Sequence, residues 1–468
     1  MRNIRMMRTE RACAAALWCW LAIGAAPAHA ALCGDVTGDG FFKASDGLQT
    51  LRYAVASKYD RRGDVWPSPQ GDGKLTASDA LDILRKSVEG VIPSCLGATA
   101  TRAVVTTAPI DFSSAGLAVV ALGPEDVTKR SVSVRLGALS TDAVVRAPSG
   151  VPIVINRTPW NTLQFLDVDK PSLPNVKECS VNGGIRDEGG ANPQDVLLVS
   201  GSKGYVTPYR GDSLFVIDPD VLLHSQVDPA CKTLIKGHID LSGFDGDGIP
   251  EMDQMVMVGT DLFVSMQLLD NNHAPTHGAG RIAVIDTATD TLKGSIALSF
   301  ANPFAATKGL PYDEFQNRIF VGGPGRIPDD TGDGSNLEDG AIEAIDPSTM
   351  QSAGVLLTGA DIHANIFDFV IVGTGRAFAI IADQESNSVV EIDLVQRKIK
   401  KVLLSSQALI SDIEMTETGE LWVAYRGEDN DDPSGIRIFR VAGGSDISEI
   451  TARPISLGQA PFTLAFVP

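Results

Sequence analysis

The feature that most constrains the fold is a hydrophobic strand ending in Leu-Asp or Ile-Asp, which recurs along most of the chain. The clear copies end at Leu166-Asp167, Ile217-Asp218, Ile285-Asp286, Ile345-Asp346 and Ile392-Asp393, and two weaker copies lie at Ala121-Leu122 and Ile438-Phe439. Most of the resulting units are 46 to 68 residues long. Between them lie β-branched runs and Gly, Pro, Asn and Asp turns, which predict strands rather than helices. From residue 101 onward the chain is therefore expected to repeat one all-β unit seven times.

Each unit also carries a strand before the Ile-Asp strand. Examples are Tyr205-Val206-Thr207, Phe263-Val264-Ser265, Phe320-Val321-Gly322 and Trp422-Val423-Ala424. A unit of this length accommodates four short strands, which is the size of a propeller blade. The sequence thus predicts a mainly β fold, a seven-bladed β-propeller over 101–468. The C-terminal run Ala460–Phe466 is expected to form the innermost strand of the first blade, which closes the ring and removes two free sheet edges.

The repeats resemble the secreted YVTN-type β-propellers, as in Gly204-Tyr205-Val206-Thr207 followed by Leu214–Asp218. The resemblance extends over nearly all of 101–468. Its motif is diffuse, so it implies a fold and not an activity.

A second kind of repeat lies before the propeller. Asp35, Thr37 and Asp39 fall at positions 1, 3 and 5 of a calcium loop, with the Phe41 carbonyl at position 7 and Asp46 at position 12. A copy follows 33 residues later, with Gln70, Asp72, Lys74 and Asp79 at the corresponding positions. The first loop matches the pattern fully. The second departs from it, because Ser68 and Gln70 stand where carboxylates or amides are usual at positions 1 and 3.

This duplicated loop and helix pattern resembles a dockerin over about 31–98, so a small α-helical calcium module is expected. The resemblance implies Ca²⁺ as cofactor and a cohesin-like partner, recognised through positions 10 and 11. Those positions are occupied by Ala44 and Ser45 in the first copy and by Ala77 and Ser78 in the second. A calcium-stabilised structural module without a cohesin partner is the alternative.

Residues 1–30 have the pattern of a signal peptide. Arg2, Arg5, Arg8 and Arg11 precede the apolar stretch Ala12–Ala26, and Ala28-His29-Ala30 forms a small-x-small cleavage site. A secreted protein, extracellular or periplasmic, is expected. Four cysteines remain, and an even number in an exported chain indicates two disulfides with three pairings open. Pairing within each domain joins Cys33 to Cys95 and Cys179 to Cys231.

Composition excludes two classes of protein. The net charge of -19 opposes general binding to nucleic-acid phosphates. No apolar run reaches 18 residues, so no membrane-spanning helix is expected. The sequence also contains no Gly-x-Ser-x-Gly elbow, phosphate loop or paired-His motif on a helix. His273 and His277 stand four apart, but Pro275 and Gly278 favour a surface loop.

One end of the predicted ring gathers carboxylates. Near the starts of innermost strands lie Asp142, Asp195, Asp253, Asp368 and Asp412, with Ala305 and Thr463 at the two remaining places. Second strands on the same side are followed by Arg157, Arg210 and Arg426. A ring of five carboxylates at a channel mouth is a cation-site hypothesis. We favour the alternative that each Asp caps a turn or pairs with a neighbouring Arg.

Two insertions on that side contain the Asp-x-Asp-Gly kernel of a calcium loop. They place Asp245 and Asp247 in one loop and Asp329 and Asp333 in the other, and neither has a clean carboxylate at position 12. Each is either a calcium site or a solvated acidic turn.

Two functions therefore follow from the sequence. The first is a secreted, calcium-binding, non-catalytic binding or adhesion protein, whose propeller face binds an extracellular partner. The alternative is an extracellular polysaccharide-degrading hydrolase or lyase tethered by the dockerin-like module.

Overall fold

The structure analysed is a computed structural model of the whole chain. It describes residues 36–37, 39, 43–56, 58, 61–63, 74–89, 100–109, 111–123, 125–136, 139–166, 177–183, 185, 189–223, 231–269, 278–304, 309–314, 316–326, 338–383, 386–427, 432–441 and 446–467. The signal peptide predicted at 1–30 lies outside these residues, and so do Cys33 and Cys95.

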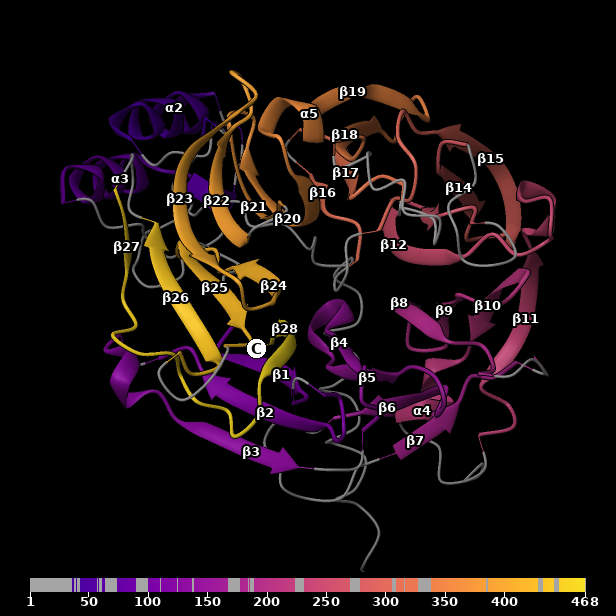
Figure 1. Cartoon of the computed structure of the whole chain (residues 1–468). Helices are drawn as coiled ribbons and strands as arrows, with labels where there is room; N and C mark the ends of the chain where they lie inside the picture. The colour runs from indigo at the N-terminus through magenta and orange to yellow at the C-terminus, as the bar shows by residue number, and fades with distance from the viewer. Residues whose placement is uncertain are drawn as a thin grey trace, which may run out of the picture.

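The propeller predicted from the repeats is confirmed. In the described part of the chain, 28 strands form seven four-stranded antiparallel sheets arranged around a common axis (Figure 1). From the axis outward, the blades are β28 (Pro461–Val467), β1 (Arg102–Thr107), β2 (Gly116–Ala121), β3 (Val132–Leu136); β4 (Val144–Arg146), β5 (Ile153–Asn156), β6 (Thr162–Phe165), β7 (Lys177–Ser180); β8 (Pro193–Ser200), β9 (Lys203–Pro208), β10 (Ser213–Ile217), β11 (Ile235–Asp240); β12 (Met252–Val258), β13 (Asp261–Met266), β14 (Arg281–Asp286), β15 (Thr291–Ala297); β16 (Tyr312–Asp313), β17 (Arg318–Gly323), β18 (Ala341–Asp346), β19 (Gln351–Thr358); β20 (Asn365–Gly373), β21 (Arg376–Ala382), β22 (Asn387–Asp393), β23 (Lys398–Ser406); and β24 (Ile410–Met415), β25 (Glu420–Tyr425), β26 (Gly435–Val441), β27 (Ile447–Glu449).

Helices are short and few in the described part of the propeller. They are η2 (Val127–Lys129), η3 (Pro148–Gly150), α4 (Pro219–Leu223), η4 (Ser242–Phe244) and α5 (Gly359–Ile362).

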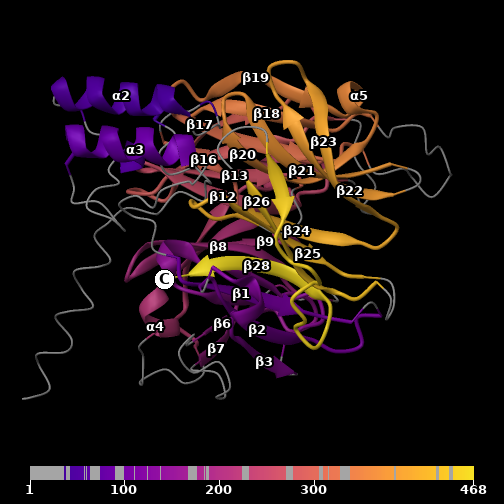
Figure 2. The same ribbon diagram turned by 90° about the vertical axis from the view of Figure 1, so that its left-hand side faces the viewer.

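Two longer helices precede the propeller, α2 (Ala44–Val55) and α3 (Ala77–Glu89), with the short η1 (Arg61–Gly63) between them. They lie side by side against one edge of the ring (Figures 1 and 2). Each begins at position 10 of the corresponding predicted calcium loop, so position 12, Asp46 or Asp79, lies in its first turn. The backbone carbonyl of Asp39, in the first loop, lies next to Gly375 in the turn between β20 and β21.

Burial decreases from the inner strands to the rim, and the sequence follows it. Second strands such as β25 are buried along their whole length, because a blade packs between two neighbours. The outermost strands are exposed, and β23 accordingly carries Lys398, Lys400 and Lys401. The apolar cores lie between blades: one such core joins Phe378 of β21 to Tyr425 of β25.

The disulfide predicted between Cys179 and Cys231 is confirmed. Cys179 lies in β7, the outermost strand of one blade, whereas Cys231 lies shortly before β11, the outermost strand of the next. The bond therefore holds two neighbouring blades together at the rim, where fewer buried apolar contacts do so.

The ring closes through the C-terminal strand. β28 pairs antiparallel with β1, and Leu464 lies opposite Val105. Leu464 also packs in the core shared with Trp422 of the last blade, and the ring of Phe466 meets Trp422 edge to face at 5.6 Å between centroids. This is the closure expected from the sequence.

No helix in the described residues is both long and apolar enough to span a membrane.

A chain that ends at Ile455 tests the contribution of closure. It exposes the edge of β1 and removes Leu464 and Phe466 from the core, so we expect aggregation or a loss comparable with the ~5–15 kcal/mol that stabilises an ordinary domain. Size-exclusion chromatography and urea unfolding measure this. Deletion of 1–97 is the control and should leave a monomer that unfolds cooperatively. A truncated monomer as stable as the full chain would contradict the role given to β28.

Candidate functional site

The aspartates predicted at one end of the ring are found there. Asp195, Asp253, Asp368 and Asp412 lie within the first four residues of β8, β12, β20 and β24, and Asp142 stands two residues before β4. We call the face of the disc at which the innermost strands begin the entry face. Second strands end on this face, and Arg157, Arg210 and Arg426 directly follow or stand close after β5, β9 and β25.

Three of these aspartates connect neighbouring blades. Oδ2 of Asp195 accepts a hydrogen bond from the backbone N–H of Met255 in the next blade at 2.8 Å. In the same way, Oδ2 of Asp368 accepts from the N–H of Ile413 at 3.0 Å, and Oδ2 of Asp412 accepts from the N–H of Leu464 at 2.7 Å. The inner edge of each strand has no neighbouring strand to pair with its N–H groups, so a side-chain acceptor satisfies them.

Thr463 performs the same task in the closing blade. Its hydroxyl accepts from the N–H of Val145 at 3.0 Å and bonds to the hydroxyl of Thr106 at 2.8 Å. We call Asp195, Asp368, Asp412 and Thr463 the bridging side chains. The hypothesis that the aspartates form one cation-binding ring is not supported at these positions, since Oδ2 of each of the three aspartates already accepts from a backbone amide of the next blade.

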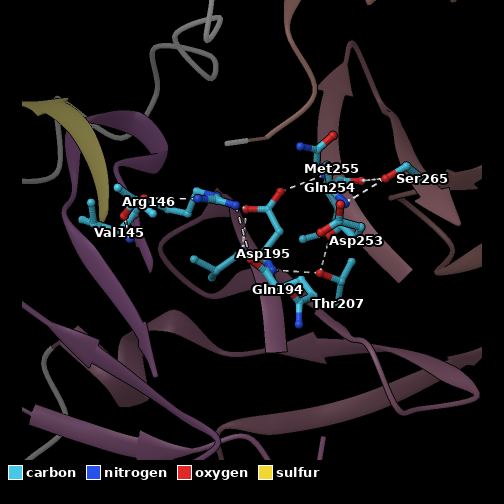
Figure 3. Close-up of polar contacts among 11 residues, drawn as sticks. Val145, Arg146, Gln194, Asp195, Thr207, Asp253, Gln254, Met255 and Ser265 are labelled. Atoms are coloured by element: carbon cyan, nitrogen blue, oxygen red, sulfur yellow. Dashed lines mark hydrogen bonds and ion pairs between the residues drawn. The ribbon is translucent and has the colours of Figure 1, made fainter. Parts of the chain in front are cut away.

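Asp195 also forms a buried ion pair (Figure 3). Nε of Arg146 in β4 donates to its Oδ1 at 2.9 Å, and Nη2 of Arg146 donates to the carbonyl of Gln194 at 3.3 Å. Both charged side chains are buried. Burial raises the pKa of Asp195, whereas Arg146 and the amide of Met255 act in the opposite direction. Asp195 thus connects three successive blades, those of β4, β8 and β12.

Comparison of Asp195→Asn with Asp412→Asn tests this difference in partners. Both variants keep an oxygen for the amide of the next blade, but the first leaves the buried guanidinium of Arg146 without its carboxylate. We expect a loss of about 3–5 kcal/mol for Asp195→Asn and about 1 kcal/mol for Asp412→Asn. Urea unfolding of both variants measures the two losses. Equal losses would show that the ion pair adds nothing to the bridge.

The other two aspartates, Asp142 and Asp253, act electrostatically on Arg157. Val144 pairs with Ile155 in the sheet, so Asp142 and Arg157 stand at the same end of the hairpin β4–β5. Asp142 accepts from the hydroxyl of Ser140 at 2.7 Å. Oδ2 of Asp253 is buried and has no hydrogen-bond partner in the described structure. Neither carboxylate accepts a hydrogen bond from Arg157 within the described residues.

Burial perturbs both charged groups. It raises the pKa of Asp253 to about 7, and the charge of Asp195 acts in the same direction. The charges of Arg157 and Arg146 and the side-chain amide of Gln267 act to lower this pKa. Burial also lowers the pKa of Arg157, while the charges of Asp142 and Asp253 raise it.

The raised pKa of Asp253 predicts a pH-dependent stability. Between the ordinary carboxyl pKa and about 7, the folded protein holds a proton that the unfolded chain has lost, so stability is fully present at low pH and decreases as pH rises through 7. Asp253→Asn removes this dependence. Between pH 5 and pH 8 we expect the free energy of unfolding of the wild type to fall on the order of 1–3 kcal/mol more than that of the variant. Urea unfolding at both pH values measures it, and parallel pH profiles would contradict it.

Arg426 is committed to the closure of the ring. Its guanidinium stacks over the ring of Phe112 at 4.8 Å and donates to the carbonyls of Ala108 and Pro109 at 3.1 and 2.9 Å. It therefore holds the loop after β1 rather than a ligand.

The acidic loop between η4 and β12 brings three carboxylates together. One oxygen from each of Asp245, Asp247 and Glu251 lies within 4.8 Å of the others. Asp245 and Asp247 were identified from the sequence, but Glu251 was not, because it stands at position 7 of the loop rather than position 12. The spacing Asp-x-Asp-x-x-x-Glu is the signal that identifies it. Asp329 and Asp333 of the second insertion lie outside the described residues.

The predicted residues of the first N-terminal loop are described in part. Asp46 is buried, and its carboxylate accepts from the N–H and the hydroxyl of Thr37 at 2.9 and 2.8 Å and from the N–H of Lys43 at 2.7 Å. Asp39 pairs with the Lys43 ammonium at 2.8 Å. Asp35 and Phe41 lie outside the described residues.

In the second loop, Asp79 is buried and accepts from the N–H and hydroxyl of Thr76, both at 2.7 Å. Lys74 is exposed, whereas Gln70 and Asp72 lie outside the described residues. The predicted partner-binding residues are exposed in the first turns of α2 and α3, and they are Ala44, Ser45, Ala77 and Ser78.

Comparisons with known proteins assign neither a family nor a function to this chain. No family model matches the sequence, and no curated protein matches it. Among solved structures, the chain is similar to Kuenenia stuttgartiensis hydrazine synthase (14% identity, TM-score 0.34, over 53% of this chain and 62% of that one). Another is the dihydro-heme d1 dehydrogenase NirN in complex with DHE (14%, 0.44, over 80% and 69%). A third is the WD40 domain of Toxoplasma gondii coronin (11%, 0.42, over 68% and 71%). The chain thus spans less than two thirds of the length of the first of these proteins. By its own strands the chain is a seven-bladed β-propeller protein.

Proposed function

We propose that this protein is an exported, calcium-dependent, non-catalytic binding protein whose entry face recognises an extracellular partner. The observation that carries the proposal is the group of three carboxylates at Asp245, Asp247 and Glu251. It lies in the loop that leads into β12, the strand that also holds Asp253 on the entry face.

The spacing of these carboxylates suits Ca²⁺. Calcium binds six to eight oxygens at about 2.3–2.6 Å, so two oxygens on opposite sides of the ion stand about 4.8 Å apart. The three oxygens of the loop lie within 4.8 Å of one another. Backbone carbonyls and water would complete the shell, as they do in other calcium loops.

Backbone amides orient all three carboxylates. The N–H groups of Gly246 and Ile249 donate to Asp245 and Asp247 at 2.5 and 2.8 Å. The N–H of Leu269, which follows β13, donates to Glu251 at 2.8 Å. Glu251 is itself in the left-handed region, at φ 43°, a conformation that is costly for a residue with a Cβ. A cation bound here would connect the loop to the neighbouring turn.

The N-terminal helices form the second part of the proposal. Thr37 and Asp46, at positions 3 and 12 of the first loop, are already in contact through hydrogen bonds. This supports a calcium-binding module of the dockerin kind, with Ca²⁺ held by the first loop. The exposed pairs at the starts of α2 and α3 would meet a cohesin-like partner.

Export is proposed from the leader-like residues 1–30 together with the disulfide between Cys179 and Cys231. Disulfides persist in oxidising compartments and are rare in the cytosol.

Calcium titration of the full mature chain tests the proposal. Isothermal calorimetry should detect two calcium sites. Asp247→Asn should weaken calcium binding at one site and Asp39→Ala at the other, each by at least about tenfold, because the number of ligand charges sets affinity. At 100 times Kd, calcium should add ~2.7 kcal/mol to the stability of whatever unit binds it. The matched control is Asp240→Asn, because exposed Asp240 accepts from the N–H of Ser242 at 2.9 Å and stands outside the carboxylate group.

Two results would overturn the proposal. Unchanged calcium binding in Asp247→Asn would remove the propeller site. Calcium-dependent release of reducing ends from a polysaccharide by the purified protein would replace the binding role with the enzymatic alternative.

A further inference from the structure

Arg157 is a buried cation, and in the part of the chain that the structure describes two of its nitrogens have no hydrogen-bond acceptor. The residue keeps only 9% of its surface exposed, and Nε and Nη2 have no partner within the described residues. A buried charged donor without an acceptor costs free energy, so such groups normally have a partner. The cost is unusual for a structural residue and ordinary for one that binds a ligand.

The two unpartnered nitrogens lie on the same edge of the guanidinium. Nε and Nη2 donate in parallel and match the two oxygens of a carboxylate. This protein uses the same edge elsewhere: Arg437 donates from Nε and Nη2 to the two oxygens of Glu449, each at 2.8 Å. At Arg157 the corresponding carboxylate is absent from the described residues.

The carboxylates around Arg157 do not take this place. Asp195 is engaged by Arg146 and the amide of Met255, and Asp142 accepts from Ser140. Oδ2 of Asp253, which also acts on Arg157 electrostatically, is buried and has no partner within the described structure. These residues therefore offer a ligand two parallel donors, Nε and Nη2 of Arg157, and one acceptor, Oδ2 of Asp253.

We propose that Arg157 binds the carboxylate of a ligand and that Oδ2 of Asp253 accepts a hydrogen bond from a hydroxyl or ammonium group on the same ligand. The proposal deepens the proposed function, on which it rests, by naming the class of partner. The carboxylates of Asp142 and Asp195 also act on Arg157 electrostatically and would repel a second negative charge on the ligand, so a singly charged carboxylate suits the site better than a phosphate dianion.

The full mature chain tests this with four probes: acetate, glycolate, glycine and inorganic phosphate. Calorimetry gives affinity. Fluorescence of Trp160 reports on the site, because Trp160 is 42% exposed and stands three residues from Arg157, to whose carbonyl its backbone N–H donates. Glycolate or glycine should bind more tightly than acetate, and the better of the two shows whether the donor is a hydroxyl or an ammonium.

Two variants assign the contacts. Arg157→Lys keeps the charge but loses the fork, and it should weaken glycolate and glycine binding by at least about tenfold. Asp253→Ala should remove their advantage over acetate. Arg437→Lys, which alters the same kind of fork in another blade, is the matched control and should leave binding unchanged. Cooperative urea unfolding of each variant confirms that it is folded.

Three results would overturn the carboxylate site. They are no binding of any probe at millimolar concentration, tighter binding of phosphate than of glycolate and glycine, and unchanged affinity in folded Arg157→Lys. Calcium titration of the same samples distinguishes this failure from that of the proposed function. Intact calcium binding with no carboxylate binding would reject this site alone.

Discussion

The rest of the structure depends on hydrogen bonds that cross from one blade to the next near the axis. An innermost strand has a partner on one edge only, so its other edge presents amides that must find acceptors when buried. Asp195, Asp368, Asp412 and Thr463 supply them, each to the following blade. Because these short side chains reach only a few ångströms, they fix the distance between blades and hold the entry face in one arrangement.

Closure of the ring uses the same interaction. Asp412 accepts from the amide of Leu464 in β28, and Thr463 of β28 in turn holds Val145 of β4. The C-terminal strand β28 therefore forms the same kind of hydrogen bonds near the axis as the innermost strands of other blades. Trp422 and Phe466 add an apolar contact across the same joint. Hydrogen bonds set the geometry there, and burial of aromatic surface supplies much of the free energy.

The candidate carboxylate site lies where aspartates at the inner strands do not bridge to the next blade. Asp142 and Asp253 occupy positions equivalent to the bridging aspartates, but within the described structure neither accepts an amide of the next blade. The charges of both aspartates act on Arg157. β12 connects this region to the carboxylate loop, since Glu251 stands two residues before Asp253. A calcium ion that orders the loop would therefore also fix the position of Asp253. The proposed calcium and carboxylate sites thus share β12.

The sequence by itself determined the seven blades, the closure by Ala460–Phe466, and the placement of the aspartates on one face, because these depend on repeat length and strand order. Local spacing also identified Asp245 and Asp247. Only the tertiary structure decided which aspartates bridge blades, since Asp195 meets Met255 across 60 residues of chain. It also set the carboxylate oxygens of Asp245, Asp247 and Glu251 within 4.8 Å of one another. Within the described residues it left Nε and Nη2 of Arg157 without an acceptor. Contacts of this kind depend on the register between neighbouring blades, and no local pattern in the sequence encodes that register.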